Sequence, residues 1–231
     1  MFRYILSGGD MQSWVISILL TLPIVLLSLS LHETAHGYAA YKLGDPTARA
    51  LGRLTLSPLK HLDPVGFISM LVFGFGWAKP VPINSRYFKK PRRDIALTAL
   101  AGPASNLLLA LVFLLLLRFV GYGVLARVPL STELIYNLVY FTILFFYYGV
   151  YMNITLAVFN LLPLPPLDGS RLLFYFLPPK WYFKIAPYER YITLAVMLLL
   201  VLGPLSELIG WLTTLILRGL FALVGMPGFL L

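Results

Sequence analysis

The sequence predicts an all-α polytopic membrane protein with five or six transmembrane helices. Hydrophobic residues make up 59% of the 231 residues and charged residues only 12%, whereas about 25% of residues are charged in soluble domains. The mean hydropathy is +0.85, and several apolar runs reach the roughly 20 residues that cross a bilayer. We therefore expect one membrane-embedded domain over residues 1–231 and no separate soluble domain.

The first span is expected from about Gln12 to Ala40, with a kink at Pro23. A cleaved signal peptide would end in small residues after a short apolar run. This apolar run is long, and it is followed by His32 and Glu33 instead of a small-residue cleavage site. We therefore interpret the segment as a retained first helix.

The apolar segment from Pro64 to Trp77 is too short to cross the membrane, because a spanning helix needs about 20 residues. Its three glycines, Gly66, Gly74 and Gly76, argue against a stable helix. Irregular backbone at membrane depth is tolerated only where protein covers it. We expect a membrane-associated re-entrant or β-like segment around residues 64–84.

The remaining spans follow from four later apolar runs. They are about Ile95–Arg118, Leu134–Leu162, Tyr191–Leu202 and Leu208–Val224. The third span ends where Pro163 opens a proline-rich turn. The last two runs are separated by Gly203 and Pro204 and form either two short spans or a hairpin, which leaves five or six crossings.

The basic residues predict the orientation. Ten of the eighteen Lys and Arg lie between Lys42 and Arg93, and such a block marks the cytoplasmic side and favours anionic headgroups. We expect a multi-pass protein of the cytoplasmic membrane with its N-terminus outside, the lipid bilayer as its surroundings and no nucleic acid as partner. This topology places His36 and Asp168 on the same, cytoplasmic side.

Residues 32–36 read H-E-x-x-H at the end of the first apolar run. Two His at positions i and i+4 of a helix share one face and can both bind one zinc ion. Glu33, between them, is placed to act as a general base. Ionisable side chains are costly within a membrane segment and indicate function. The motif also occurs by chance, so a third ligand is required.

The chain has no Cys, so the third ligand must be a carboxylate or another His. Most of the nine acidic residues lie in or beside polar connections, whereas Asp168 follows a helix broken by prolines. Asp168 is the candidate ligand, and a turn or helix N-cap is the alternative. We interpret His61 as exposed, with an auxiliary metal or proton site as the alternative. Asn106 is expected to form an interhelical hydrogen bond.

These motifs resemble the site-2 protease family of intramembrane zinc metalloproteases, specifically its short prokaryotic members, which lack PDZ and CBS domains. A second family motif is an Asn followed eight residues later by Asp-Gly, here Asn160 and Asp168-Gly169. The two motifs stand in the family's order on the first and third spans. The segments Gly74–Asn84 and Ala101–Asn106 also resemble those short members.

The resemblance implies a set of site residues. His32, His36 and Asp168 would bind one Zn²⁺ per chain, and Glu33 would be the catalytic base. Asn160 would be a second catalytic residue that donates a hydrogen bond to the substrate backbone or the oxyanion. A cap at the end of its helix is the alternative for Asn160.

The implied activity is that of a zinc-dependent intramembrane endopeptidase that cleaves transmembrane or signal-anchor segments. Such cleavage serves regulated intramembrane proteolysis or the clearance of signal-peptide remnants. The alternative is a divalent metal transporter or channel built on the same polar cluster, but transporters commonly show paired repeats with broken helices. An inactive scaffold is disfavoured by the intact Glu33 and ligand set. The sequence leaves the substrate and the oligomeric state open, a homo-oligomer included.

Overall fold

The computed structural model describes residues 11–73, 76–124 and 132–226. Residues 74 and 75 of the predicted segment 64–84, Gly74 among them, therefore lie outside the described residues. The α-helices are α2 Met11–Lys42, α3 Thr47–Ala50, α4 Pro58–His61, α5 Pro64–Phe73, α6 Pro91–Arg118, α7 Glu133–Leu161, α8 Asp168–Phe176, α9 Pro179–Ile185, α10 Glu189–Leu202 and α11 Pro204–Leu223. Short turns of other helix types are η1 Ser85–Tyr87, η2 Phe119–Val124 and η3 Ala186–Tyr188.

Five helical stretches in the described residues are long and apolar enough to cross a membrane. They are Val15–Lys42, Pro91–Gly121, Glu133–Leu161, Pro179–Leu202 and Pro204–Leu223. The prediction of an all-α polytopic fold is therefore confirmed. The last two stretches turn at Gly203, whose φ of +111° is a conformation that favours glycine.

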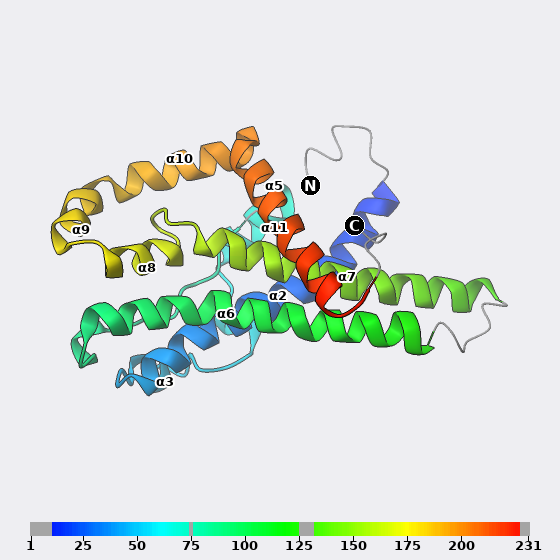
Figure 1. The fold of residues 1–231 in the computed structure, drawn as a ribbon, viewed down its shortest axis with the longest axis horizontal. Coiled ribbons are helices and arrows are strands. Elements are labelled where there is room, and N and C mark those ends of the chain that lie inside the picture. Colours follow the sequence, from blue (N-terminus) through cyan, green and yellow to red (C-terminus); the bar gives the residue numbers. More distant parts are fainter. Residues whose placement is uncertain (1–10, 74–75, 125–131, 227–231) are drawn as a thin grey trace.

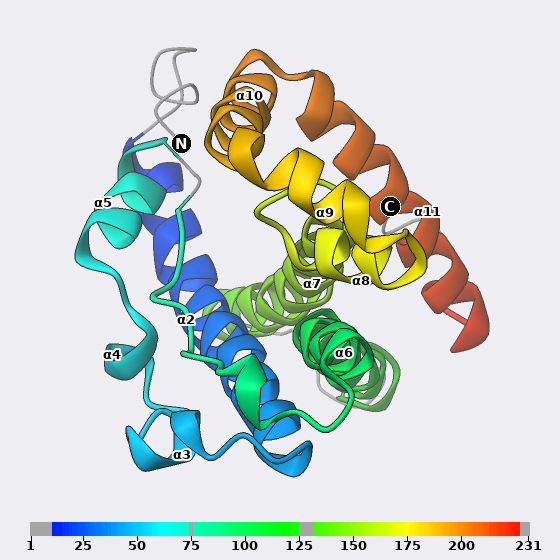
Figure 2. The same ribbon diagram turned by 90° about the vertical axis from the view of Figure 1, so that its left-hand side faces the viewer.

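The three helices that matter most for the site are α2, α6 and α7. Figure 1 shows α6 and α7 running antiparallel along the long axis, and α2 lies obliquely against both of them. α6 packs against α2, α7 and α8, and α7 also contacts α11. Viewed from the end, α2 and α11 lie on opposite sides of the α6–α7 pair (Figure 2). α6 therefore contacts each of the three helices α2, α7 and α8.

The apolar core lies where α6 and α7 meet. Ala110, Leu114, Val150 and Ile154 are all fully buried there. Gly149 permits the close approach of the two helices, because a Cβ at this position would lie 2.5 Å from the ring of Phe113. Tight packing in this region fixes α7 against α6 next to the parts of both helices that contribute to the site.

The segment around residues 64–84 differs in part from expectation. We expected its glycines to prevent a helix, but Pro64–Phe73 form the ten-residue helix α5. Gly66 does not break this helix; a Cβ there would lie 2.2 Å from the carbonyl oxygen of Trp77, so the glycine allows a close contact. The second half is extended and includes one antiparallel β-bridge, between Leu62 and Ala78.

Candidate metal centre

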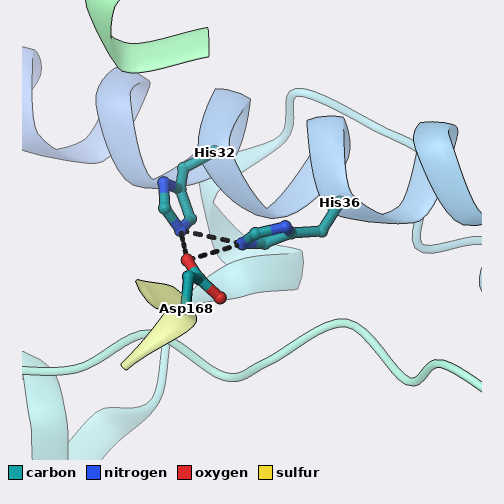
Figure 3. Close-up of side chains that lie close together, drawn as sticks. All are labelled: His32, His36 and Asp168. Carbon is teal, nitrogen blue, oxygen red and sulfur yellow. Dashed lines mark hydrogen bonds and ion pairs between the residues drawn. The ribbon is translucent and has the colours of Figure 1, made fainter. Parts of the chain in front are cut away.

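His32 and His36 lie one turn apart on α2 and are nearly fully buried, with 6% and 7% of their surfaces exposed. Asp168, the first residue of α8, meets them after the proline-rich turn that ends α7. Its Oδ2 lies 3.2 Å from the Nε2 of His32 and 3.1 Å from the Nε2 of His36, and the two Nε2 atoms are 2.9 Å apart (Figure 3). The structure thus brings together the three residues predicted as ligands.

A chain of hydrogen bonds fixes the tautomer of His32. Its far end is the carbonyl of Gly149, which can only accept, so the Asn153 amide donates to it at 2.8 Å. The Asn153 oxygen then accepts from the Asn106 amide at 3.1 Å. The remaining Asn106 oxygen accepts from the Nδ1–H of His32 at 2.6 Å. Nε2 of His32 therefore keeps its lone pair in the neutral ring.

His36 is held in the same tautomer by a simpler contact. Its Nδ1 lies 2.7 Å from the backbone carbonyl oxygen of Thr98 on α6, which can only accept. Nε2 of His36 therefore also keeps its lone pair in the neutral ring. Second-sphere hydrogen bonds of this kind orient histidines that bind metals.

The donor set fits a metal ion. Two nitrogen lone pairs and a carboxylate oxygen converge within 3.2 Å of one another, which is unfavourable unless a cation lies among them. In a tetrahedral zinc site, bonds of about 2.0–2.1 Å place neighbouring ligand atoms about 3.3 Å apart. Among the His and acidic residues in the described part of the chain, His32, His36 and Asp168 form the group whose ligand atoms lie close enough together to hold a metal.

Asp168 is ionised in this environment. Burial acts to raise the pKa of its carboxyl, but donation from His32 and His36 when their Nε2 atoms are protonated outweighs that effect and lowers the pKa below the usual range; a cation bound in place of those protons would act in the same direction. The carboxylate is the form that binds metals. The next residue, Gly169, has no side chain to obstruct the contact between α8 and α7. A Cβ at this position would lie 2.2 Å from the carbonyl oxygen of Leu161, so glycine allows α8 to begin directly against the end of α7.

The centre opens into a cavity of about 210 Å³ that Glu33, Asn160 and Arg171 also line. Oε2 of Glu33 accepts a hydrogen bond of 2.7 Å from the backbone N–H of Val81, in the extended chain. The Asn160 amide donates to the carbonyl of Leu156 at 3.0 Å, within its own helix. The catalytic roles of Glu33 and Asn160 stay predictions.

Gly102 has a function that the sequence did not reveal. A Cβ at this position would lie 2.4 Å from Nε2 of His36 and 2.6 Å from Cε1 of His32. Glycine is therefore required on the face of α6 that the two imidazoles touch. The expectation for Asn106, an interhelical hydrogen bond, is confirmed by its contact with Asn153.

Three further site residues were missed. Thr98 acts through its backbone carbonyl, which no sequence pattern reveals. Asn153 is a polar residue within an apolar span, which was a usable signal. Arg171 lies three residues after Asp168 and thus on the same face of α8, which was also a usable signal. Each of them lies at or just behind the cavity wall.

His61 is buried, not exposed as we expected. Only 2% of its surface is exposed, because α4 lies against α2. Its Nε2 lies 2.7 Å from the carbonyl oxygen of Thr55 and 3.4 Å from Oγ1 of Thr34, a residue of the H-E-x-x-H motif. Position in a basic connection was thus a poor guide to the burial of this ring.

Comparison with known proteins points to one family. A protein from Bacillus subtilis named "Putative zinc metalloprotease YwhC" is 46% identical over 188 residues, covering 81% of this chain and 82% of that protein. A protein from Mycolicibacterium smegmatis named "Putative zinc metalloprotease Rip2" is 30% identical over 199 residues, covering 80% of this chain and 70% of that protein. No solved structure matches the chain significantly.

The family model described as peptidase family M50 matches residues 20–203. This match spans the H-E-x-x-H motif, Asn160 and Asp168, together with the helices that bring them to one centre. It confirms the resemblance to site-2 proteases that these motifs suggested. The chain belongs to peptidase family M50.

Proposed function

We propose that this multi-pass membrane metalloprotease is an intramembrane endopeptidase that holds one Zn²⁺ on His32, His36 and Asp168. It hydrolyses peptide bonds within or near transmembrane segments of membrane proteins, signal anchors included. The whole chain acts as one membrane-embedded domain. The observation that carries the proposal is the convergence of two imidazole lone pairs and one carboxylate oxygen within 3.2 Å.

The tautomers support this assignment over a simple buried ion pair. Asn106 and the Thr98 carbonyl hold both Nδ1–H groups, so both Nε2 atoms are available as ligands. Two His and one carboxylate are a recurrent catalytic zinc set, which leaves a position open for water or substrate. Bound zinc in such a site polarises a carbonyl oxygen and lowers the pKa of water.

Glu33 is the residue that moves the proton. It lines the cavity next to the ligands, and its carboxylate takes a proton from the attacking water and later delivers it to the leaving amine. The Val81 N–H, 2.7 Å from Oε2, holds one oxygen in place, so the other is available for proton transfer. The Asn160 amide has two N–H groups and donates one to Leu156; the second can stabilise the developing oxyanion.

Two of the three ligands and both proposed catalytic residues lie within the first and third spans, which favours a segment of membrane protein as the substrate. His32 and His36 lie inside the stretch Val15–Lys42, and Asn160 inside Glu133–Leu161. The basic connection between residues 42 and 93 supports an active site on the cytoplasmic side of the cytoplasmic membrane, with the N-terminus outside. This orientation can be measured with single cysteines placed in the N-terminal region or in the basic connection. A membrane-impermeant thiol reagent added to intact cells should label the first and not the second.

The experiment that tests the function compares the purified wild type with Glu33→Gln and Asp168→Ala. Zinc per polypeptide is measured beside cleavage of a synthetic transmembrane peptide in detergent micelles. We expect about one zinc in the wild type and Glu33→Gln, cleavage in the wild type alone, and loss of zinc in Asp168→Ala. Glu189→Gln, an exposed position on α10, is the matched control and should retain both properties.

Three outcomes contradict the proposal. Full zinc in Asp168→Ala would remove this residue from the ligand set. Cleavage by Glu33→Gln at the wild-type rate would show that another group is the base. Sustained zinc flux through proteoliposomes that contain Glu33→Gln would instead favour a transporter.

A further inference from the structure

Among the described residues that line the metal cavity, Arg171 is the one with a permanent positive charge. It belongs to the first turn of α8, three residues after the ligand Asp168, so the two side chains share one face of that helix. Unlike the two histidines, Arg171 is exposed. Its guanidinium therefore lies where the cavity meets the surroundings, and a peptide bound at the metal centre passes close to it.

The guanidinium of Arg171 has no hydrogen bond and no ion pair with any of the described residues. An Asp and an Arg three positions apart on a helix are placed to pair with each other. Here Oδ2 of Asp168 instead lies against the two histidines, and Oε2 of Glu33 accepts from a backbone N–H. The five N–H donors of Arg171 are thus available to a ligand.

The charges within the cavity favour an anionic ligand. Glu33 and Asp168 contribute two negative charges as carboxylates, and both line the cavity. A bound Zn²⁺ would neutralise these two charges, and the imidazoles that bind it are neutral. Arg171 then leaves the cavity with one net positive charge. An additional cation in the cavity would be repelled, whereas an additional carboxylate would be attracted.

The chain around the cavity is basic as well. Lys79 directly precedes the lining residue Pro80, and Arg92 lies three residues before the lining residue Ile95; both basic residues are exposed. The guanidinium of Arg92 donates to three backbone carbonyls at the end of α8, at 2.6 to 3.3 Å, so no carboxylate cancels its charge. A positive field of this kind attracts acidic segments and repels basic ones.

We propose, on the basis of the peptidase function proposed above, that Arg171 binds the side-chain carboxylate of an Asp or Glu beside the scissile bond. Three residues of a helix rise about 4.5 Å, and each residue of an extended peptide spans about 3.3 Å. The carboxylate therefore belongs to a substrate residue within about two positions of the scissile bond. Arg171 is thus a specificity residue that selects membrane segments with an acidic residue at this position.

The selection has an attractive and a repulsive part. An acidic side chain that leaves water for the cavity needs a partner, and a guanidinium can donate two parallel hydrogen bonds to one carboxylate. A Lys or Arg at the same substrate position would face Arg171 without a partner, which is unfavourable. The substrates are therefore distinguished by the sign of one charge, and reversal of the charge on the enzyme should reverse the preference.

The test uses synthetic transmembrane peptides whose cleavage site has been mapped by mass spectrometry and whose C-termini are amidated. Glu, Gln or Lys is placed singly at each of the two positions on either side of the site. Binding is measured in detergent by fluorescence anisotropy with Glu33→Gln, which should bind without cleavage. At one position we expect the Glu peptide to bind about fivefold more tightly than the Gln peptide, and the Lys peptide to bind least tightly.

The preference is then compared between variants in the same Glu33→Gln background. Arg171→Glu should reverse the order, so that the Lys peptide binds most tightly, and Arg171→Gln should bind the Glu and Gln peptides equally. Arg190→Gln is the matched control, because Arg190 is exposed on α10 and does not line the metal cavity; it should keep the original order. With Glu33 intact, kcat/KM should follow the same order, and Arg171→Gln should keep its zinc.

Several outcomes would overturn the proposal. Equal binding of the three peptides at every position is one, and an unchanged order in Arg171→Glu is another. Tighter binding of a peptide that ends at the preferred position with a free carboxylate would assign Arg171 to a chain terminus instead. An equal loss of cleavage for all peptides in Arg171→Gln, with their order unchanged, would assign it to the reaction itself.

These failures differ from failure of the peptidase function. In that case the wild type cleaves no peptide, or cleavage persists in Glu33→Gln. The order of binding is measured without cleavage and within each variant, so a general loss of activity does not mimic the result.

Discussion

Substitution of Gly102 by Ala places one methyl group directly against the metal centre. The new Cβ would lie 2.4 Å from Nε2 of His36 and 2.6 Å from Cε1 of His32, whereas ordinary contacts begin at about 3.4 Å. The His36 nitrogen must therefore move by roughly 1 Å, several times the tolerance of about 0.2 Å for a metal ligand. A displacement of 1 Å can cost about 100-fold in rate.

We expect Gly102→Ala to fold, because Ala is about 1 kcal/mol more favourable than Gly inside a helix. Its zinc affinity, measured by competition with a chelator, should fall at least about tenfold, and peptide cleavage about 100-fold. Gly219→Ala on α11 is the matched control, because a Cβ there meets no atom within 4 Å. Unchanged zinc affinity in Gly102→Ala would refute the view that the centre needs this glycine.

Three other predictions follow from contacts behind and beside the centre. Asn106→Leu should weaken zinc binding about 10–100-fold and Asn153→Leu less, because Asn153 acts only through Asn106; equal affinities in competition titrations would contradict the hydrogen-bond chain. Removal of zinc by a chelator should abolish peptide cleavage and lower the melting temperature in detergent, and added zinc should restore both; cleavage that persists without metal would exclude the proposed chemistry. Asp45→Ala should lower the free energy of unfolding by about 3 kcal/mol, because the buried carboxylate accepts hydrogen bonds from Thr47 and Asn84; an unchanged melting temperature would contradict this.

The spans were predictable because each depends on local composition. The expected bounds of the first three spans agree with α2, α6 and α7 to within a few residues. The helical nature of α5 was not predictable in this way. Gly66 has a low helix propensity, but its missing side chain permits close contact with the Trp77 carbonyl. This tertiary contact overrides the local propensity.

The three candidate ligands could be predicted from the chemical character of their side chains and not from secondary-structure propensity. Histidines and carboxylates are rare in apolar segments, so His32, His36 and Asp168 were conspicuous. His61 was misjudged because its burial depends on how α4 lies against α2, which the local sequence does not encode. The carbonyl of Thr98 was beyond sequence reasoning altogether, since every residue has a carbonyl.

The hydrogen-bond chain behind His32 links the chemistry of the centre to the packing of the membrane helices. It runs from α2 through Asn106 of α6 to Asn153 and Gly149 of α7. Gly149 is also the residue whose missing Cβ allows Phe113 of α6 to pack against α7. Gly149 therefore makes both contacts: its missing Cβ lets the apolar core close, and its carbonyl, the final acceptor, sets the direction of the chain and the tautomer of His32. A change in the α6–α7 distance would alter the metal centre even though no ligand is touched.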